Sequence, residues 1–499
     1  MNLLCLSRQK SFALVPLLAL AACGGPGGPS VVLITVDTLR PDRLSCYGHS
    51  RETSPHLDKL AAEGVLFERA YAQCNSTGPA HASLLSGVHV KTHGVLNNSL
   101  GYRRDDIPTL AQRFQEAGYS TGAVVSIGHL NRGHSGLGRG FDQFVGVRPR
   151  LDTPDGASKN WSRPSHEAVN LAIEFVRRAG SKPYFLWLHV FDPHMPYDPD
   201  PAYAERYASD LTGRVADMRR LIHREATPAE VMSEMPEVSP EEVVLFESAW
   251  RHEIPIPELI YNGVGWTPGE VEALESLYDG EIAQTDEQIG RLVEALEWAA
   301  ASPPLIVVTA DHGESFGKGG IYFDHRGIFE DSIRIPLIYW WPSMLREGRR
   351  VVESVEAIDL VPTVLALAGI GADAGLPGRD LSNVLLEGGV VTARPCFVEH
   401  ANESALAVIE GRWKLILSRL EGREDVAPLV YRHAPVALFD LDSDPEESVD
   451  VGEAHPEIAA RLTELALAWL ADDLAPTADG DGALSPEMRQ QLKALGYID

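Results

Sequence analysis

Three short apolar runs predict strands that are buried on both faces of a sheet. They cover residues 31–36 (VVLITV), 184–190 (YFLWLHV) and 305–309 (LIVVT). Nearly continuous apolar runs of this length are typical of strands inside a parallel sheet that helices cover on both sides. A fourth run at residues 121–126 has a similar character. The chain therefore contains at least four candidate strands of one central sheet.

Helical patterns alternate with these runs. Leucine and alanine at helical spacing predict helices over residues 55–64 and 109–118, and an amphipathic pattern predicts a long helix over residues 270–300. Strands that alternate with helices are typical of an α/β fold with a mainly parallel sheet.

The pattern changes near residue 390. Four short strands and then one helix are predicted, at residues 396–398, 405–410, 413–417, 438–441 and 456–470. We therefore assign residues 31–390 to a main domain and residues 391–499 to a small α+β subdomain with an antiparallel sheet. Residues 202–265 are acidic and show no regular pattern, so we predict an irregular insertion over one face of the main domain.

The N-terminus has the pattern of an export signal. Two basic residues precede an apolar run at residues 12–22, which is too short to span a bilayer as a helix. The run ends in LAAC, which resembles a bacterial lipoprotein cleavage box. Residues 1–22 are thus predicted to be a signal peptide and residues 23–30 a flexible tether. The mature protein would be exported and anchored by a lipid on Cys23, facing the periplasm or the cell exterior. An ordinary secretory signal is the alternative.

Composition and charge indicate a globular protein and exclude some classes of partner. The 499 residues are 44% hydrophobic and 23% charged, as in globular proteins. The net charge of −28 argues against a nucleic-acid partner, which favours a basic surface. An anionic substrate is still compatible with this charge, because a bound metal ion supplies local positive charge. Five cysteines are too few for a disulfide scaffold.

Acidic residues follow three of the predicted strands. Ligands of α/β proteins gather beyond the carboxyl ends of the strands, where Asp37, Asp192 and Asp311 are expected to lie. Asp37 together with the pair Asp311-His312 offers two carboxylates and an imidazole, which suits a divalent metal such as Ca²⁺, Mn²⁺ or Zn²⁺. Asp192, which precedes a proline, is more typical of a turn.

A hydroxyl group stands at the start of a predicted helix of small residues. The segment NSTGPAHASLLSG places Thr77 where free backbone N–H groups favour an anion. Thr77 is therefore either a nucleophile or a helix cap. A nearby metal would lower the pKa of this hydroxyl and neutralise charge on a transferring phosphoryl or sulfuryl group.

Several motifs in sequence order carry a family resemblance. They are ITVDTLRPDRLSCYG, TGPAHASLLSG, DPHMPY, VTADHGESFG, EDSIRIPLI, GRWKLI and LFDLDSDPEE. On these motifs the chain resembles the sulfatase family of the alkaline phosphatase superfamily along nearly all of its mature length. The resemblance implies a large, mixed, mainly parallel sheet of the alkaline phosphatase type and hydrolysis of a sulfate or phosphate-type ester. It also implies one divalent metal, often Ca²⁺.

The resemblance assigns roles to individual positions. The implied metal ligands are Asp37, Thr77, Asp311 and His312, and the implied catalytic or substrate-contacting residues are Thr77, His81, His194 and His325. Thr77 occupies the nucleophile position of the C/S-x-P-x-R motif, and His81 replaces the motif arginine. His81 could contact the substrate only if it is protonated or donates a hydrogen bond; alternatively, it donates to a backbone carbonyl.

One departure from the family pattern changes the expected chemistry. Sulfatases convert the motif cysteine or serine to formylglycine, and Thr77 cannot yield that aldehyde, so no formylglycine is expected. A threonine nucleophile is found instead in phosphodiesterase and phosphoethanolamine-transferase relatives. We therefore favour phosphoester or phosphonate hydrolysis through Thr77. The alternatives are a sulfatase that works without formylglycine, a headgroup transferase, and a non-catalytic cell-surface binding protein with a decayed site.

Overall fold

The computed structural model describes most of the two predicted domains. The described residues are 27–147, 162–223, 266–299, 303–342, 344–346, 348–371, 375–418 and 436–471. The predicted signal peptide, Cys23 and most of the predicted insertion lie outside these residues. None of the helices in the described part is long and apolar enough to cross a membrane.

A mixed, mainly parallel sheet forms the centre of the molecule. Its strand order is β10-β2-β9-β6-β1-β5-β3-β4, and β11 pairs with β2. The strands are β1 (Val31–Val36), β2 (Val65–Tyr71), β3 (Ser120–Val124), β4 (Gln143–Val145), β5 (Tyr184–Val190), β6 (Leu305–Ala310), β9 (Arg334–Trp340), β10 (Arg349–Val351) and β11 (Val355–Glu356). β1 runs parallel to both β5 and β6, whereas β9 is antiparallel to β2 and β6. The predicted fold class is confirmed.

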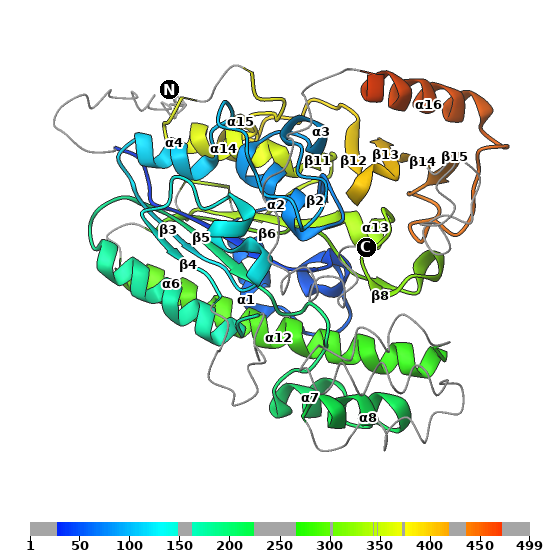
Figure 1. Cartoon of the computed structure of the whole chain (residues 1–499), viewed down its shortest axis with the longest axis horizontal. Coiled ribbons are helices and arrows are strands. Elements are labelled where there is room, and N and C mark those ends of the chain that lie inside the picture. The colour runs from blue at the N-terminus through cyan, green and yellow to red at the C-terminus, as the bar shows by residue number, and fades with distance from the viewer. Residues whose placement is uncertain are drawn as a thin grey trace, which may run out of the picture.

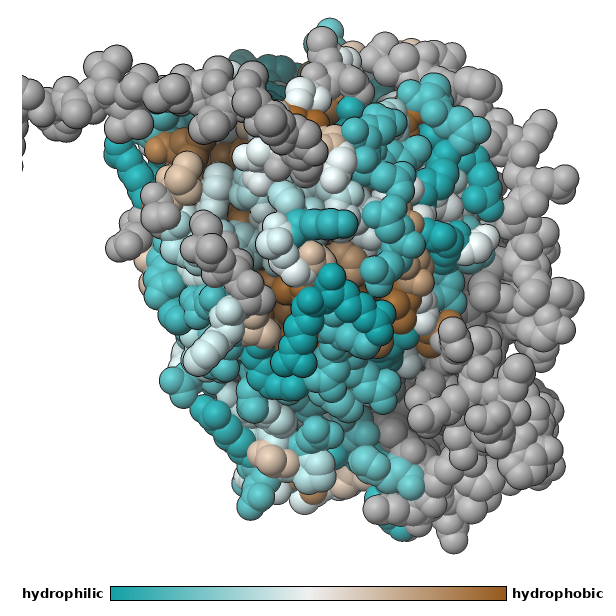
Figure 2. All heavy atoms as spheres, turned by 90° about the vertical axis from the view of Figure 1, so that its left-hand side faces the viewer, coloured by the Kyte–Doolittle hydropathy of each residue, from teal (hydrophilic) through white to brown (hydrophobic). Residues whose placement is uncertain are grey.

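Helices cover both faces of this sheet (Figure 1). The longer helices are α1 (Pro55–Glu63), α2 (Thr77–Ser86), α4 (Leu110–Glu116), α6 (Ser165–Ala179), α12 (Pro268–Ala299) and α14 (Leu360–Leu367). α6 and α12 lie below the sheet in Figure 1, and α2, α4 and α14 lie above it. Shorter elements are α3 (Val90–His93), α5 (Arg132–Ser135), α13 (Glu330–Ile333), α15 (Ser382–Glu387), β7 (Ser315–Phe316) and β8 (Tyr322–Asp324). The face shown in Figure 2 is mostly hydrophilic, with hydrophobic side chains in small groups.

The first part of the predicted insertion is helical, so the prediction of irregular structure was wrong there. α7 (Pro201–Tyr207) and α8 (Gly213–Ile222) pack on the outer side of α12. The guanidinium of Arg214 on α8 pairs with Glu270 on α12 at 2.5 Å and lies 4.6 Å from the ring centroid of Trp266. The helical pattern was hard to recognise because many residues of these two helices are charged. They form ion pairs such as this one near the surface, and so they interrupt the apolar spacing.

A second sheet follows in the C-terminal part. It is antiparallel, with the order β12 (Cys396–Glu399), β13 (Ala405–Glu410), β14 (Trp413–Ser418) and β15 (Val436–Asp440). Alternate residues face opposite sides: Leu406 and Val408 pack on α16 (Pro456–Ala471), whereas Ala407 and Ile409 join a cluster with residues of α13 and its flanks. The predicted antiparallel sheet is thus confirmed. The buried Lys414 on β14 pairs with Glu330 of α13 at 3.3 Å. Because α13 directly precedes β9, this ion pair connects the antiparallel sheet to the central sheet.

Candidate active site

The candidate site lies at the carboxyl ends of three neighbouring strands. Val36 at the end of β1 is paired with Val190 of β5 and with Ala310 of β6. Asp37 and Asp311 follow directly, so the strand register places their side chains together. Ligand atoms of Asp37, Asp311 and His312 all lie within 4.8 Å of one another, and all three residues are buried. The structure therefore brings together the three residues that the strand ends suggested as metal ligands.

Hydrogen bonds fix the orientation of the pair Asp311-His312. Asp311 Oδ1 accepts from the backbone N–H groups of Thr38 at 3.3 Å and of His312 at 2.9 Å. The His312 ring faces a backbone carbonyl, with Nδ1 2.9 Å from Gly313 O. Because a carbonyl can only accept, Nδ1 carries the proton and the Nε2 lone pair faces the carboxylates. His312 Nε2 lies 3.5 Å from Asp311 Oδ2 and 3.8 Å from Asp37 Oδ1.

The backbone beside Asp37 is strained. Thr38 has φ 54°, in the left-handed region that β-branched residues seldom adopt. Two hydrogen bonds hold it there: its N–H reaches Asp311, and its carbonyl accepts from the Tyr278 hydroxyl at 2.6 Å. Strain of this kind persists where the surroundings hold it in place, and it is concentrated at functional sites.

The donor set fits a divalent cation. Both carboxylate oxygens of Asp37 and Oδ2 of Asp311 are buried and have no hydrogen-bond partner among the described residues. Burial and the neighbouring Asp311 and Glu314 raise the pKa of Asp37 well above its ordinary value, and burial also raises the pKa of Asp311. Two adjacent, buried carboxylates are costly unless a positive charge compensates them. Oxygen ligands with one imidazole lone pair suit such an ion.

Thr77 contacts this cluster from the first turn of α2. Its Oγ1 lies 3.3 Å from His312 Nε2. Ser76, not Thr77, is the cap residue of α2, and the cap position makes no side-chain hydrogen bond. The Thr77 hydroxyl is therefore aimed at the carboxylates and the imidazole, and it does not close the end of the helix.

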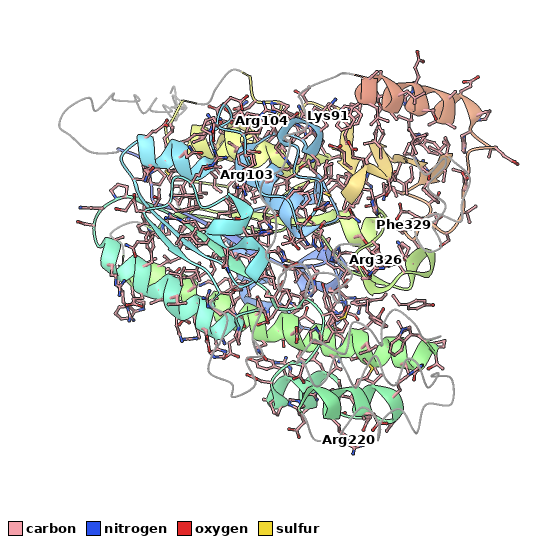
Figure 3. All side chains as sticks on the ribbon, viewed as in Figure 1. Lys91, Arg103, Arg104, Arg220, Arg326 and Phe329 are labelled. Carbon is pink, nitrogen blue, oxygen red and sulfur yellow. The ribbon has the colours of Figure 1, made fainter. Side chains whose placement is uncertain are left out.

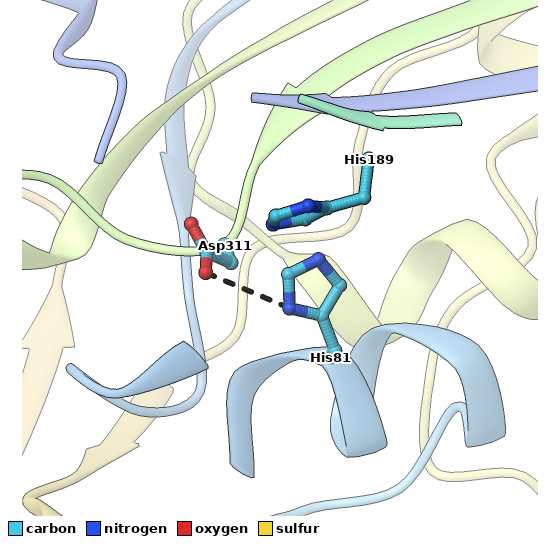
Figure 4. A group of neighbouring side chains, drawn as sticks. All are labelled: His81, His189 and Asp311. Atoms are coloured by element: carbon cyan, nitrogen blue, oxygen red, sulfur yellow. Dashed lines mark ion pairs between the residues drawn. The ribbon is translucent and has the colours of Figure 1, made fainter. Parts of the chain in front are cut away.

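His81 is held by hydrogen bonds at both ring nitrogens. Nδ1 lies 2.8 Å from the Thr77 carbonyl, and Nε2 lies 3.1 Å from Thr35 Oγ1, which accepts from Trp187 Nε1 at 3.0 Å. Burial lowers the pKa of His81, so the ring is neutral near pH 7 and donates from Nδ1 to the carbonyl. Nδ1 is also 3.5 Å from Asp311 Oδ2 (Figure 4). This geometry matches the alternative in which His81 holds the backbone of Thr77.

His194 and His325 extend the row of histidines away from the carboxylates. The ring centroid of His325 is 4.2 Å from that of His312 and 6.0 Å from that of His194. Each Nδ1 faces a backbone carbonyl, at 2.7 Å from Met195 O and 2.6 Å from Asn75 O. Burial lowers the pKa of His194 to about 4 and that of His325 well below its ordinary value. Both rings are thus neutral near pH 7 in the protein without substrate.

Asp192 does not join this cluster. Its Oδ2 accepts from the backbone N–H of Ser165 at 2.8 Å, at the start of α6. As expected, Asp192 lies in a turn, in which the His194 N–H donates to the Phe191 carbonyl at 2.9 Å.

His189, which supports Asp37, was not predicted from the sequence. His189 Nδ1 lies 3.3 Å from the Ser126 backbone N–H, which can only donate, so the ring proton is on Nε2. Nε2 lies 3.3 Å from Asp37 Oδ2, an ion-pair distance, although the pair lacks the geometry of a hydrogen bond. His81 and His189 approach Asp311 from α2 and β5 (Figure 4). A histidine inside the otherwise apolar run YFLWLHV was the signal that could have identified it.

Asn98 was also missed. Its Oδ1 accepts from the Gly78 backbone N–H at 2.6 Å, next to Thr77. Its Nδ2 is buried and has no partner in the described part of the chain. A Cβ added at Gly78 would lie 2.9 Å from Asn98 Oδ1, so the glycine permits this close approach. The segment around Asn98 has no regular pattern, and so no feature of the sequence pointed to this contact.

We predict that replacing His189 with alanine weakens divalent-cation binding about 10- to 100-fold, the usual cost of losing a residue that orients a metal ligand. Calorimetric titration of the chelator-treated protein with Ca²⁺ and Mn²⁺ measures the change. His93→Ala is the matched control, because His93 is also buried but bonds to Ser83 at 2.9 Å, outside the cluster. Equal losses in both variants would contradict the role given to His189.

Comparisons with known proteins identify the family. The family model described as Sulfatase matches residues 29–370, and a model of the N-sulphoglucosamine sulphohydrolase C-terminal region matches residues 317–467. An arylsulfatase of Clostridium perfringens is 25% identical over 468 residues, covering 84% of this chain and 89% of the relative. An N-acetylglucosamine-6-O-sulfatase of Bacteroides thetaiotaomicron is 25% identical over 428 residues, covering 76% and 75%.

Solved structures share the fold. A phosphonate monoester hydrolase of Agrobacterium radiobacter has a TM-score of 0.65 at 24% identity, covering 90% of this chain and 97% of that one. A structure in complex with D-glucosamine-2-N,6-O-disulfate has a TM-score of 0.65 at 20% identity, covering 95% and 99%. Proteins of the matched family are hydrolases that typically use a divalent metal. Since the family model spans well over half of the sequence, this chain belongs to the sulfatase family of metal-dependent hydrolases.

Proposed function

We propose that this protein hydrolyses a phosphate or phosphonate ester, with the Thr77 hydroxyl as the nucleophile. One observation carries the proposal: Thr77 Oγ1 points into a buried cluster of two carboxylates and an imidazole, 3.3 Å from His312 Nε2. A threonine there supplies an alkoxide after deprotonation, but it cannot supply the aldehyde hydrate on which the sulfatase mechanism depends.

The reaction would run in two displacements at phosphorus. Thr77 Oγ1 loses its proton and bonds to phosphorus, while the ester oxygen leaves and takes up a proton. A water molecule then attacks the same phosphorus, and the Thr77 oxygen leaves and is protonated again. Asp37, Asp311, His312 and Thr77 would hold the divalent cation, with Ca²⁺ first among the family-based candidates and Mn²⁺ or Zn²⁺ as alternatives. Such an ion would lower the pKa of the hydroxyl and neutralise charge on the transferring group.

The polar groups around α2 support the proposal. The family arginine would offer a charged, bidentate donor, but His81 is neutral and bonded at both nitrogens. Asn98 Nδ2 is a candidate replacement, because it is buried and has no hydrogen-bond partner among the described residues, while Oδ1 of the same side chain contacts Gly78. We assign Asn98 as a donor to a non-bridging oxygen of the transferring group, where a fixed amide stabilises developing charge.

Asn98→Asp is expected to lower kcat by about 10²- to 10³-fold, the usual cost of one oxyanion donor. Aspartate keeps the Oδ1 acceptor for Gly78 but replaces the amide donor with an acceptor. Steady-state kinetics on the preferred substrate measures the loss. Asn97→Asp is the control one residue away, because Asn97 Oδ1 accepts from Ser99 and an aspartate keeps that acceptor. A similar kcat for Asn98→Asp and the wild type would remove Asn98 from the reaction.

Sulfate-ester hydrolysis without formylglycine is the second candidate. The named relatives favour it, since they include an arylsulfatase and an N-acetylglucosamine-6-O-sulfatase. A decayed, non-catalytic site is less well supported, because the ligand atoms of Asp37, Asp311 and His312 still lie within 4.8 Å of one another.

Parallel assays decide between these functions. The purified protein is given an aryl sulfate, an aryl phosphate monoester, an aryl phosphodiester and an aryl phosphonate monoester, with and without a chelator. We expect chelator-sensitive turnover, with kcat/KM highest for one of the three phosphorus esters. Dominant turnover of the sulfate would overturn the proposal in favour of the second candidate. No turnover of any ester, with or without added Ca²⁺, Mn²⁺ or Zn²⁺, would favour the binding protein.

We also propose that the mature protein is exported and anchored by a lipid on Cys23. The LAAC sequence and the Gly/Pro-rich tether that follows it support this location. Cys23→Ala is expected to move the protein from the membrane pellet to the soluble fraction of fractionated bacterial cells. Detection of the protein by antibody in both fractions measures the shift. An unchanged distribution would contradict lipid anchoring at this residue.

A further inference from the structure

We propose that an open cavity of the main domain binds a second anionic group of the substrate, a sulfate or a phosphate. The proposal rests on the proposed function, because it places the reacting group at Thr77. The cavity has a volume of about 590 Å³. Its lining includes Arg103, Arg132 and Arg139 together with one carboxylate, Asp105. The preferred substrate would therefore carry at least two anionic groups.

Two of the three arginines form no ion pair with a carboxylate of the described residues. Arg139 pairs with Asp105. Neither Arg103 nor Arg132 lies within ion-pair distance of a carboxylate belonging to the described ranges. The cavity thus carries an excess of positive charge in a protein whose net charge is −28. Local positive charge in a concave site concentrates anions.

Neutral groups hold the exposed side chain of Arg132 in place. The guanidinium of Arg132 donates to the Phe141 carbonyl and lies 5.7 Å from the ring centroid of Phe144. Arg103 is exposed, and among the described residues its side chain makes one long contact, from Nη1 to the Tyr102 carbonyl at 3.5 Å, so most of its five N–H donors are accessible to a ligand. Planar guanidinium groups suit sulfate and phosphate oxygens because they donate in pairs.

Glycines bring the chain close to these arginines. A Cβ added at Gly136 would lie 2.9 Å from Arg103 Nη1, and one added at Gly138 would lie 2.6 Å from Arg132 Cγ. Gly136 also has φ 68°, in the left-handed region that favours glycine. The segment RGHSGLGRG thus combines arginines with the small residues that their packing requires.

The cavity is linked to the reacting group through Asn98. Asn98 Oδ1 accepts from Gly78 beside Thr77, and the Asn98 carbonyl accepts from His134 Nε2 at 2.7 Å. His134 belongs to the segment that lines the cavity. Asn98 and Arg103 are five residues apart, so their Cα atoms are separated by at most about 17 Å. This upper limit keeps the cavity within reach of an extended substrate whose reacting group would lie at Thr77, because Asn98 contacts the neighbouring Gly78.

A double variant tests this cavity by binding. In Arg103→Ala/Arg132→Ala, affinity for an anionic probe is expected to fall at least about tenfold, because charge-assisted hydrogen bonds are lost. The control is Arg177→Ala/Arg220→Ala, which removes the same charge from α6 and α8; Arg220 lies at the bottom of Figure 3, far from Arg103. The control is expected to stay within about twofold of the wild type. Equal thermal midpoints show that the variants fold.

Two probes distinguish the source of the anion. A fluorescent sulfated tetrasaccharide and a fluorescent tripolyphosphate are titrated separately into the wild type and both double variants. Tighter binding of one probe identifies that chemistry. Binding of neither probe to the wild type, or equal binding to the wild type and to Arg103→Ala/Arg132→Ala, would overturn the proposal.

Kinetics separates this proposal from the proposed function. For an aryl ester with a single anionic group, Arg103→Ala/Arg132→Ala is expected to keep kcat/KM within about twofold, because such an ester does not reach the cavity. A tenfold loss on this ester would place the arginines in the reacting site instead and would also overturn the proposal. Failure of the wild type to cleave any phosphorus ester would overturn the proposed function, whereas the binding result would stand by itself.

Discussion

Asp311→Asn is expected to abolish measurable hydrolysis and, at the same time, to make the chelator-treated protein more stable to heat. Asp311 Oδ2 is one of three buried carboxylate oxygens in the cluster without a hydrogen-bond partner in the described chain, so it is available to a cation. Loss of such a ligand removes several kcal/mol of stabilisation of the transition state, which corresponds to at least about 10³-fold in rate. The gain in stability has a separate, electrostatic origin.

The stability effect follows from the pKa directions. Burial and mutual repulsion raise the folded-state pKa of Asp37, and burial raises that of Asp311. A carboxyl whose pKa is raised on folding binds protons more tightly in the folded protein, so stability falls as pH rises from about 4, its unfolded value. Above the pKa of the folded state, the carboxyl is ionised in both states, and the loss of stability has reached its full size. The Asp311→Asn substitution would remove one of the two charges. The free-energy cost of ionising Asp37 in the folded protein would therefore decrease as well.

Thermal unfolding across pH, with chelator or with Ca²⁺, measures this prediction. In chelator, we expect the melting temperature of the wild type to fall with rising pH more steeply than that of Asp311→Asn. In Ca²⁺ the order should reverse, because only the wild type gains the binding energy. Glu356→Gln is the control: Glu356 is buried, but hydrogen bonding and pairing with His89 and Arg394 lower its pKa despite that burial, so loss of its charge should destabilise the protein at neutral pH. A less stable Asp311→Asn protein in chelator would show that repulsion in the cluster is unimportant.

The strand-end aspartates were predictable because of sheet geometry. β1, β5 and β6 are apolar on both faces, so their sequences identify them as central strands, and parallel neighbours bring their carboxyl ends to one edge. β2 and β9 were harder to recognise. In β2 the apolar run is interrupted by Glu68 and Arg69. The pairing with β9 shifts between Phe67 and Ala70, and the side chains at this bulge are only partly buried.

The role of His81 could not be obtained from the sequence. Replacement of an arginine by histidine is compatible with either a cation or a neutral donor, and the choice depends on what surrounds the ring. Thr35 lies on β1 and Trp187 on β5, and their side chains come together only in the folded sheet. The row Trp187, Thr35 and His81 ends at the Thr77 carbonyl, so three buried side chains fix the first turn of α2. Such long-range hydrogen bonds leave no periodic pattern along the chain.

Thr77→Ala is expected to lower kcat/KM on the preferred phosphorus ester by on the order of 10⁴- to 10⁶-fold, the range found when the nucleophile of a hydrolase is removed. The cluster of carboxylates stays intact in this variant, so cation affinity should change much less than activity. Thr77→Ser keeps the hydroxyl and should retain most of the activity. Steady-state kinetics and cation titration of the same preparations give both quantities.

Ser76→Ala is the matched control, because Ser76 is a neighbouring hydroxyl that makes no cap hydrogen bond on α2. We expect this variant to keep nearly full activity. Mass spectrometry of the wild-type peptide that contains Thr77 should show an unmodified threonine before turnover and a threonine-phosphoryl adduct when the reaction is quenched in acid. Full activity of Thr77→Ala would instead mean that water attacks the substrate directly. Thr77 would then act only as a support for the cation, and the two-displacement reaction would be replaced by a single one, with inversion at a chiral phosphorus centre where double displacement gives retention.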